Sequence, residues 1–181
     1  ARLLAVAGAK PKRSILFCLW AGEEYGLWGS KFFVEHNSEK MPNISNYINR
    51  DGGPTVPLGI TVTPATYNDF VKVCEPVNLI NKEFPFTVKK RVGEPQPKPV
   101  NAGAGGSDHA PFMVYGVPTF SFSTGDPKGY NFSYGEIWHT ERDTYNKNIP
   151  EYQEHASTVT AVVLYGLANL DHLLSRENLF K

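Results

Sequence analysis

Four side chains in this sequence are best suited to chemistry: Glu23, Glu24, Asp51 and His139. Carboxylate oxygens and an imidazole nitrogen are ligands that zinc takes at about 2.0–2.2 Å, and a catalytic zinc site keeps one position open for water. Zinc lowers the pKa of that water toward about 7. A neighbouring carboxylate can then remove the proton and deliver it to a leaving amine. Because adjacent side chains can point in different directions, Glu23 and Glu24 can divide these two tasks.

Each of these residues also has a plainer interpretation when it is taken alone. A Glu-Glu pair in a loop is commonly a solvated turn, an Asp-Gly-Gly run such as 51–53 is commonly a turn, and a loop histidine is commonly a surface residue. Position in the chain favours the chemical interpretation, because each residue follows a segment that we expect to be a strand. Residue types and spacing alone leave both the metal site and the solvated loop open.

The segments that must position these residues alternate between strands and helices. Short apolar runs typical of buried strands occur at 14–20, 46–50, 58–62 and 117–123. Helical spacing occurs at 1–9, 29–37, 67–82, 108–115 and 151–174. Two long irregular loops are expected at 89–106 and 124–148. This alternation predicts an α/β fold with a mostly parallel sheet covered on both faces. Ligands bind beyond the C-terminal ends of the strands in such folds, where the four side chains should meet.

Composition limits the other classes of function. The chain has 181 residues, enough for one domain, and we expect residues 1–181 to form a single domain. Lys plus Arg and Asp plus Glu each number 18, so the formal net charge is zero, which argues against a nucleic-acid binder. No apolar run is long enough to span a bilayer. Residues 1–9 match the last turns of a helix, so we expect the N-terminal part of the domain to be missing.

Four blocks occur in order along most of the chain: Ala21-Gly-Glu-Glu with Gly26-Leu-Trp-Gly-Ser, then Ile48-Asn-Arg-Asp-Gly, then Gly106-Ser-Asp-His-Ala-Pro-Phe with Gly116-Val-Pro, and finally His139-Thr-Glu-Arg-Asp-Thr. Together they resemble the zinc-dependent aminopeptidase and carboxypeptidase Q family of co-catalytic exopeptidases. That superfamily also contains glutamate carboxypeptidase and the transferrin receptor. The resemblance implies a three-layer α/β/α sandwich with a mostly parallel, mixed sheet.

The resemblance also implies roles for the four side chains. Glu23 is similar to the catalytic general base and acid, Glu24 to a ligand of one zinc, Asp51 to a ligand of the same or the other zinc, and His139 to the last ligand. Family members bind two zinc ions about 3.5–4 Å apart through five protein side chains. The first His and the bridging Asp of the family lie before the Ala-x-Glu-Glu strand, and residues 1–13 supply neither. We therefore expect this chain to bind one zinc or none and to have little activity alone.

Substrate-binding residues are expected in two places. Ser107 or Asp108 is predicted to cap the N-terminus of the following helix, with the exposed N–H groups facing a substrate carboxyl or carbonyl. Some relatives place a tyrosine near the region of 104–105, or just before the last histidine, to stabilise the oxyanion. This sequence has Trp138 before the histidine. Tyr130 and Tyr134 are candidate substitutes, and they could line a pocket for an apolar side chain.

The leading hypothesis is therefore a metal-dependent exopeptidase acting on a terminal bond of peptides or dipeptides. Two alternatives stay open. Glutaminyl cyclases resemble this family but use one zinc held by Asp, Glu and His, and receptor-type relatives keep the fold without catalysis. Relatives are commonly secreted or periplasmic, which gives the expected location. The sequence leaves open amino- against carboxypeptidase action, the side-chain preference and the oligomeric state.

Overall fold

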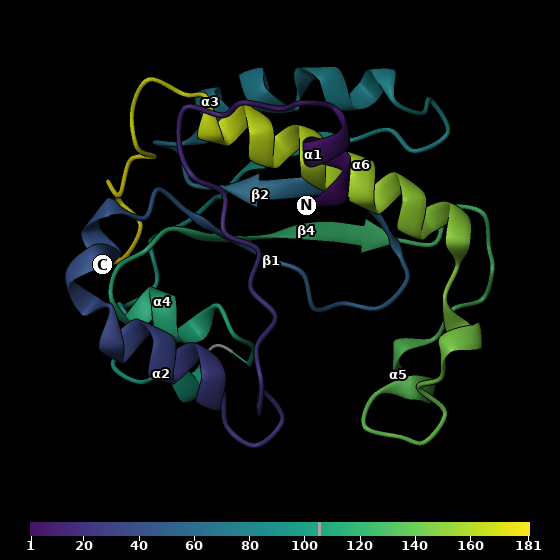
Figure 1. The fold of residues 1–181 in the computed structure, drawn as a ribbon, viewed down its shortest axis with the longest axis horizontal. Coiled ribbons are helices and arrows are strands. Elements are labelled where there is room, and N and C mark those ends of the chain that lie inside the picture. Colours follow the sequence, from purple (N-terminus) through teal and green to yellow (C-terminus); the bar gives the residue numbers. More distant parts are fainter. Residues whose placement is uncertain (105) are drawn as a thin grey trace.

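A four-stranded mixed sheet forms the centre of the molecule in the computed structural model, which describes residues 1–104 and 106–181 (Figure 1). The strands are β1 (Tyr47–Asn49), β2 (Val56–Val62), β3 (Thr87–Lys90) and β4 (Thr119–Gly125), and they lie in the order β1-β4-β2-β3. The β1–β4 and β2–β3 pairs are parallel, and the β2–β4 pair is antiparallel. Gly105, which falls in the expected 89–106 loop, lies outside the described residues.

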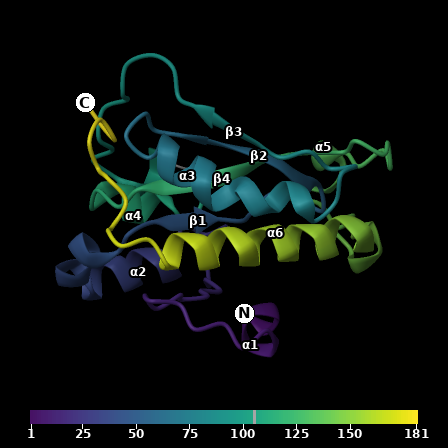
Figure 2. The same cartoon turned by 90° about the horizontal axis from the view of Figure 1, so that it is seen from above.

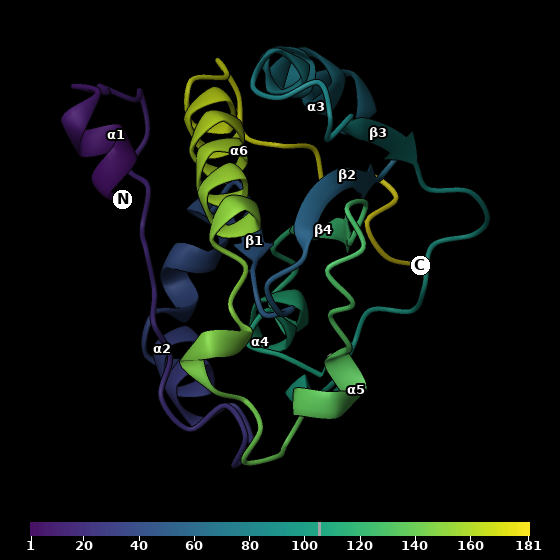
Figure 3. The same ribbon diagram turned by 90° about the vertical axis from the view of Figure 1, so that its right-hand side faces the viewer.

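Helices lie on both faces of this sheet. They are α1 (Arg2–Val6), α2 (Trp28–His36), α3 (Tyr67–Cys74), α4 (Ala110–Val114), α5 (Tyr134–Ile137) and α6 (Pro150–Ala168). Short 3₁₀ turns are η1 (Ser38–Asn43), η2 (Glu75–Leu79), η3 (Ala102–Ala104) and η4 (Tyr145–Lys147). Helices α3 and α6 cover one face, and α2 and α4 lie on the other (Figures 1 and 3). The predicted three-layer α/β/α architecture with a mixed sheet is confirmed.

The larger core lies between the sheet and the α3–α6 layer. Its members are apolar side chains that alternate along the strands and recur at helical spacing, among them Ile60, Val62, Phe70, Phe120, Val159 and Val163. The Phe70 and Phe120 rings meet edge to face with centroids 4.7 Å apart, an arrangement that aromatic pairs favour. A second cluster joins α2, η1 and α4 through Val34, Met41, Phe112 and Val117. Both faces of the sheet are therefore covered, and its strand ends remain as the place for a site.

The strand expected at 14–20 is wrong, because these residues have no regular secondary structure. The Trp20 indole donates to the Tyr47 hydroxyl at 3.0 Å, which places the end of the segment beside β1. No described strand forms a ladder with it, and a strand exists only through such pairing. The Leu16 and Leu19 side chains are consequently 69% and 99% exposed. The apolar run alone could not supply the neighbouring strand that a ladder needs.

Two expected helices end early, one for a local reason and one because of a long-range contact. The helix predicted at 67–82 stops at Cys74 and continues as the 3₁₀ turn η2. Pro76 explains this end, since proline lacks the N–H that an α-helix needs and its ring clashes with the preceding turn. The helix predicted at 151–174 stops at Ala168, whose carbonyl accepts a hydrogen bond from the Arg13 N–H at 3.1 Å. That long-range bond takes the place of the next helical turn.

The two predicted loops contain regular elements. Strand β3 occupies the start of the 89–106 loop, and α5 lies inside the 124–148 loop. Seen from above the sheet, β3 lies at its edge (Figure 2). Short elements of this size are held by tertiary contacts rather than by intrinsic propensity, so sequence periodicity did not indicate them.

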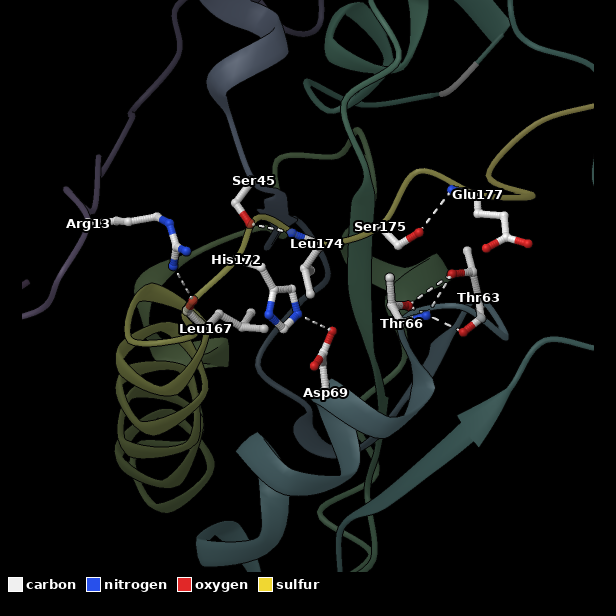
Figure 4. A network of polar contacts seen from close by, with 10 residues as sticks. All are labelled: Arg13, Ser45, Thr63, Thr66, Asp69, Leu167, His172, Leu174, Ser175 and Glu177. Carbon is white, nitrogen blue, oxygen red and sulfur yellow. Dashed lines mark hydrogen bonds and ion pairs between the residues drawn. The ribbon is translucent and has the colours of Figure 1, made fainter.

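The C-terminal tail crosses the end of the molecule and ties distant elements together (Figure 4). The Leu174 N–H donates to the Ser45 hydroxyl at 3.0 Å, and His172 Nε2 lies 3.0 Å from a carboxylate oxygen of Asp69 on α3. The tail thus fixes the chain before β1 against the α3–α6 layer. No helix among the described residues is long and apolar enough to cross a membrane.

Candidate active site

A tight turn ahead of α2 places the two adjacent glutamates. The Gly29 N–H donates to the Ala21 carbonyl at 2.9 Å, and the Trp28 N–H donates to the Gly22 carbonyl at 3.2 Å. A β-carbon on Gly29 would lie 2.9 Å from the Ala21 backbone nitrogen and oxygen, so only glycine allows this close approach. Gly26 at φ 115° also needs the freedom of glycine. The glycines of the Ala21–Ser30 block therefore fold the Glu-Glu pair back over the start of the helix.

Glu24 and His139 lie in direct contact although 115 positions separate them in the sequence. His139 Nε2 is 2.7 Å from Glu24 Oε2, and both side chains are exposed. His139 follows α5 with φ 56°, in the left-handed region that non-glycine residues seldom adopt. Such strained backbone is concentrated at functional sites. The contact brings together two of the three expected metal ligands.

The third expected ligand shares a cavity with this pair. Asp51 follows the end of β1, and the cavity of about 370 Å³ is lined by Glu24, Asp51 and His139. The other lining residues include Pro54, Tyr134, Ile137, Trp138, Asp143, Tyr145 and Lys147. Asp51 and His139 come after the parallel strands β1 and β4, as the rule for ligand sites in open sheets predicts. Among the described residues, however, no three His, Cys, Asp or Glu side chains are grouped closely enough to hold a metal ion.

The Asp51 carboxylate is oriented by a chain of hydrogen bonds from beneath. The Ser107 hydroxyl donates to Asp51 Oδ2 at 2.6 Å, and the Asn49 amide donates to the Ser107 oxygen at 3.0 Å. Ser107 is buried, with 6% of its surface exposed. Hydrogen bonds to ionised groups are the stronger kind. Ser107 therefore fixes the direction in which Asp51 faces the cavity.

Asp108 is buried beside Ser107 and joins the third block of sequence to the first. It accepts a hydrogen bond from the Ser30 hydroxyl on α2 at 2.5 Å. Burial raises the pKa of Asp108, and the negative charge of Asp51 raises it further, while the Ser30 hydrogen bond opposes the shift. The predicted capping role is wrong: His109 precedes α4, and no side chain makes a capping hydrogen bond there.

Glu23 is half-buried and lies in the field of the other carboxylates. Burial raises the pKa of Glu23 first, and the charges of Asp51, Glu24 and Asp108 raise it further, while His139 lowers it. A raised carboxyl pKa brings a proton acceptor nearer to the operating pH, which suits a general base. The arrangement can therefore take up and release a proton beside a cavity lined by carboxylate and imidazole groups.

The two candidate tyrosines occupy different places. Tyr134 lines the cavity, and its ring stacks with that of Trp138 at a centroid distance of 6.3 Å. Burial raises the pKa of Tyr134, and the charges of Asp51, Glu24 and Glu23 add to the shift. Tyr130 instead donates its hydroxyl to Glu151 at 2.8 Å and packs against α6. The structure thus places one of the two tyrosines at the cavity.

Sequence reasoning missed three contributors to this site: Ser30, Arg50 and Asp143. Ser30 and Asp143 belong to blocks already identified, so their membership of those blocks was the available signal. The Arg50 guanidinium donates to backbone carbonyls of the turn that follows it, beginning with Gly52 at 3.1 Å. Nothing in residue type or spacing indicated that contact.

Comparison with known proteins gives a consistent picture. The model of Peptidase family M28 matches residues 1–163. Carboxypeptidase Q of Xenopus laevis is 25% identical over 179 residues, covering 96% of this chain and 33% of that protein. Probable glutamate carboxypeptidase LAMP1 of Arabidopsis thaliana is 29% identical over 173 residues, covering 91% of this chain and 24% of that protein. The chain therefore spans about a quarter to a third of the length of these relatives.

Solved structures show the same fold. A Peptidase M28 precursor from Shewanella amazonensis SB2B superimposes with a TM-score of 0.60 at 20% identity, covering 87% of this chain and 32% of that one. An aminopeptidase from Aneurinibacillus sp. strain AM-1 gives a TM-score of 0.51 at 17% identity, covering 86% of this chain and 34% of that one. Since the family model covers most of the chain, the chain belongs to peptidase family M28.

Proposed function

We propose that this chain is the site-bearing part of a zinc-dependent exopeptidase that hydrolyses a terminal bond of peptides or dipeptides. One observation carries the proposal. Glu24 and His139 are in contact, and they share one cavity with Asp51. The names of relatives, carboxypeptidase Q and aminopeptidase, agree in pointing to removal of terminal residues. Residues 1–181 would then form a single but incomplete catalytic domain.

The donor set fits zinc in chemical type. Two carboxylates and one imidazole can supply three ligands and leave a position for water, which is the pattern of catalytic zinc sites. We assign Glu24, Asp51 and His139 as those ligands. A complete domain would hold two zinc ions with two further ligands from outside this chain, and the chain itself would hold one or none. Zinc, when bound, supplies a Lewis acid that lowers the pKa of water toward about 7.

Glu23 is the group that moves the proton. Its carboxylate takes a proton from the attacking water and then passes it to the leaving amine nitrogen. The raised pKa of Glu23 makes both transfers easier near neutral pH than an ordinary carboxylate would. Because the turn at Ala21–Ser30 fixes Glu23 and Glu24 together, base and ligand keep a constant relation. This division of labour between the adjacent glutamates is the core of the mechanism.

The substrate side chain would lie against the aromatic wall of the cavity. Tyr134 and Trp138 present stacked rings there, each about half exposed at 51% and 56%. An aromatic surface of this kind favours an apolar side chain. Lys147 also lines the cavity, but its ammonium group is 2.6 Å from Glu136 and is therefore already paired. Ser107 and Asp108 would support the substrate site from behind rather than from its surface, whereas Tyr130 lies against α6 and not in the cavity wall.

A second candidate is a glutaminyl cyclase-like acyl transfer with one zinc. The observation that favours it is the ligand set itself, because one aspartate, one glutamate and one histidine suffice for that chemistry. A receptor-type domain without catalysis is the third candidate. Retention of the Glu24–His139 contact and of the Asp51 cavity argues against it.

Product analysis on the complete gene product separates these candidates. An exopeptidase releases a free amino acid from dipeptides in a zinc-dependent manner, whereas a cyclase forms pyroglutamate from peptides that begin with glutamine. We expect Glu23→Gln to lower turnover by at least about 100-fold, the scale of general acid–base catalysis. Unchanged turnover in Glu23→Gln would show that the proposed mechanism is wrong.

We further propose a secreted or periplasmic location, which follows the family expectation. Peptides or dipeptides are the proposed partners, and self-association in solution is open to measurement. Fractionation of cells that express the complete gene tests the location directly. Recovery of the protein only in the cytosol would contradict it.

A further inference from the structure

The connection between β1 and β2 carries Asp51 across the sheet. Strand β4 lies between β1 and β2, so residues 50–55 must pass over the C-terminal part of β4. Two consecutive glycines, Gly52 and Gly53, lie in this connection. Glycine has the largest conformational freedom to lose on folding. A connection of this composition needs outside contacts to keep one shape.

Arg50 supplies such contacts from inside the connection. Its guanidinium donates to the carbonyl oxygens of Gly52 at 3.1 Å, Gly53 at 3.3 Å and Thr55 at 3.1 Å. A guanidinium group carries five N–H donors in one rigid plane, so it can reach several carbonyls at once. A lysine ammonium is a compact point charge without this planar fork. The three bonds close the connection into a loop around the Arg50 side chain.

The closed loop forms one wall of the cavity. Asp51, Gly53 and Pro54 all line it. A β-carbon on Gly53 would lie 2.5 Å from the Phe132 ring, so the loop packs tightly against the segment that leads to α5. At its other end, the Thr55 hydroxyl bonds the Thr124 hydroxyl of β4 at 2.8 Å. The shape of this loop therefore determines where Asp51 lies relative to the α5 side of the cavity.

We propose that Arg50 is a positioning residue, whose guanidinium holds the 51–55 loop in the one shape that presents Asp51 to the cavity. Its relevance to catalysis rests on the proposed function, but its effect on the loop does not. Arg50 occupies the variable position of the Asn-x-Asp block, and its role follows from its contacts with three backbone carbonyls.

The test is backbone dynamics of the purified chain by ¹⁵N relaxation at Gly52 and Gly53. We expect order parameters near about 0.85 in the wild type and below about 0.6 in Arg50→Ala. Arg50→Lys should resemble Arg50→Ala, because it keeps the charge but loses the fork. Addition of roughly tens of millimolar guanidinium ion should restore order in Arg50→Ala, because the free ion replaces the missing N–H donors. The same concentration of ammonium ion should not restore it. Arg2→Ala, on exposed α1, is the control.

Unchanged order at Gly52 and Gly53 in Arg50→Ala would overturn the proposal, as would equal restoration by ammonium. If Arg50→Ala fails to fold, Arg50→Lys gives the same decision: loss of order at the two glycines supports the proposal, and retained order overturns it. The outcome is independent of peptide hydrolysis. Loss of order at the two glycines in Arg50→Ala, together with a complete gene product that lacks zinc-dependent peptidase activity, would refute only the proposed function. Retained order in Arg50→Ala, together with an active complete gene product, would refute only the role of Arg50.

Discussion

Asp51 takes its direction from side chains that are far away in the sequence. Ser107 lies 56 positions later, and its hydroxyl bonds the Asp51 carboxylate while accepting the Asn49 amide hydrogen. The positions of Asp51 and His139 could be expected from strands β1 and β4 that precede them, whereas the strand predicted before Glu23 and Glu24 does not form. The Ser107–Asp51 and Ser30–Asp108 bonds could not, because they depend on how separate layers pack. Periodicity and spacing describe one element at a time and contain no such information.

Replacement of Ser107 by alanine tests the hydrogen-bond chain. It removes the donor to Asp51 and leaves the Asn49 amide without its acceptor, so we expect a loss of about 1–2 kcal/mol in the free energy of unfolding. Urea denaturation at neutral pH measures this. Ser38→Ala, at an exposed position, is the matched control and should change stability by less than about 0.5 kcal/mol. Equal stability of the two variants would argue against the Ser107 contacts.

His155 makes the stability of the fold depend on pH. The residue is only 5% exposed, its ring meets Phe84 edge to face at 4.9 Å, and its Nε2 atom has no hydrogen-bond partner among the described residues. Burial lowers the pKa of His155, and the nearby Glu151 opposes the shift. As pH falls, the unfolded chain therefore binds a proton on this histidine near pH 6.5, whereas the folded protein binds it only at a lower pH. Stability from this group is fully present above that pH and is lost as pH falls toward the folded pKa.

A variant without a titratable ring at this position isolates the effect. We expect the wild type to lose stability as pH falls below about 6.5, with a slope of up to about 1.4 kcal/mol per pH unit from this proton. His155→Gln should show a shallower slope over the same range. Ser157→Ala, at an exposed position of the same helix and without a titratable group, is the control and should keep the wild-type slope. Parallel pH profiles for wild type and His155→Gln would contradict the argument.

At the scale of elements, the turn ahead of α2 depends on the absence of a side chain at Gly29. We expect Gly29→Ala to destabilise the fold by about 1–3 kcal/mol, because the added carbon would meet backbone atoms of Ala21 that cannot move freely. Thermal or urea unfolding measures the change. Gly135→Ala is the matched control, since a β-carbon there meets nothing within 4 Å and α5 should gain from alanine. Stabilisation by Gly29→Ala would show that this turn is not as tight as described.

Element boundaries were predictable only where local chemistry sets them. Helix α2 and strands β2 and β4 follow from apolar periodicity, and the end of α3 could have been expected from Pro76. Strand β3 and helix α5 could not, because packing against neighbours determines elements this short. The early end of α6 depends on the Arg13–Ala168 backbone bond between the two ends of the chain. The residue pattern near Arg13 or Ala168 cannot indicate a contact between positions so far apart in the sequence.

At the scale of the whole molecule, the segment 14–20 is an exposed apolar surface rather than part of the sheet. Leu19 is 99% exposed, so Leu19→Lys should change the free energy of unfolding by less than about 0.5 kcal/mol. The same variant should reduce self-association, because exposed apolar patches promote it. Analytical ultracentrifugation with urea unfolding measures both effects. Strong destabilisation by Leu19→Lys would mean that this segment is buried in a sheet after all.

Our assignment is that Glu24, Asp51 and His139 would bind zinc while Glu23 acts as the base. Zinc content per chain tests it, measured by elemental analysis after equilibrium dialysis against zinc. In the complete gene product, we predict two zinc ions in the wild type and in Glu23→Gln, and fewer in Asp51→Ala and His139→Ala. A complete wild-type protein without zinc, equal zinc in all four proteins, or loss of zinc from Glu23→Gln would contradict the assignment.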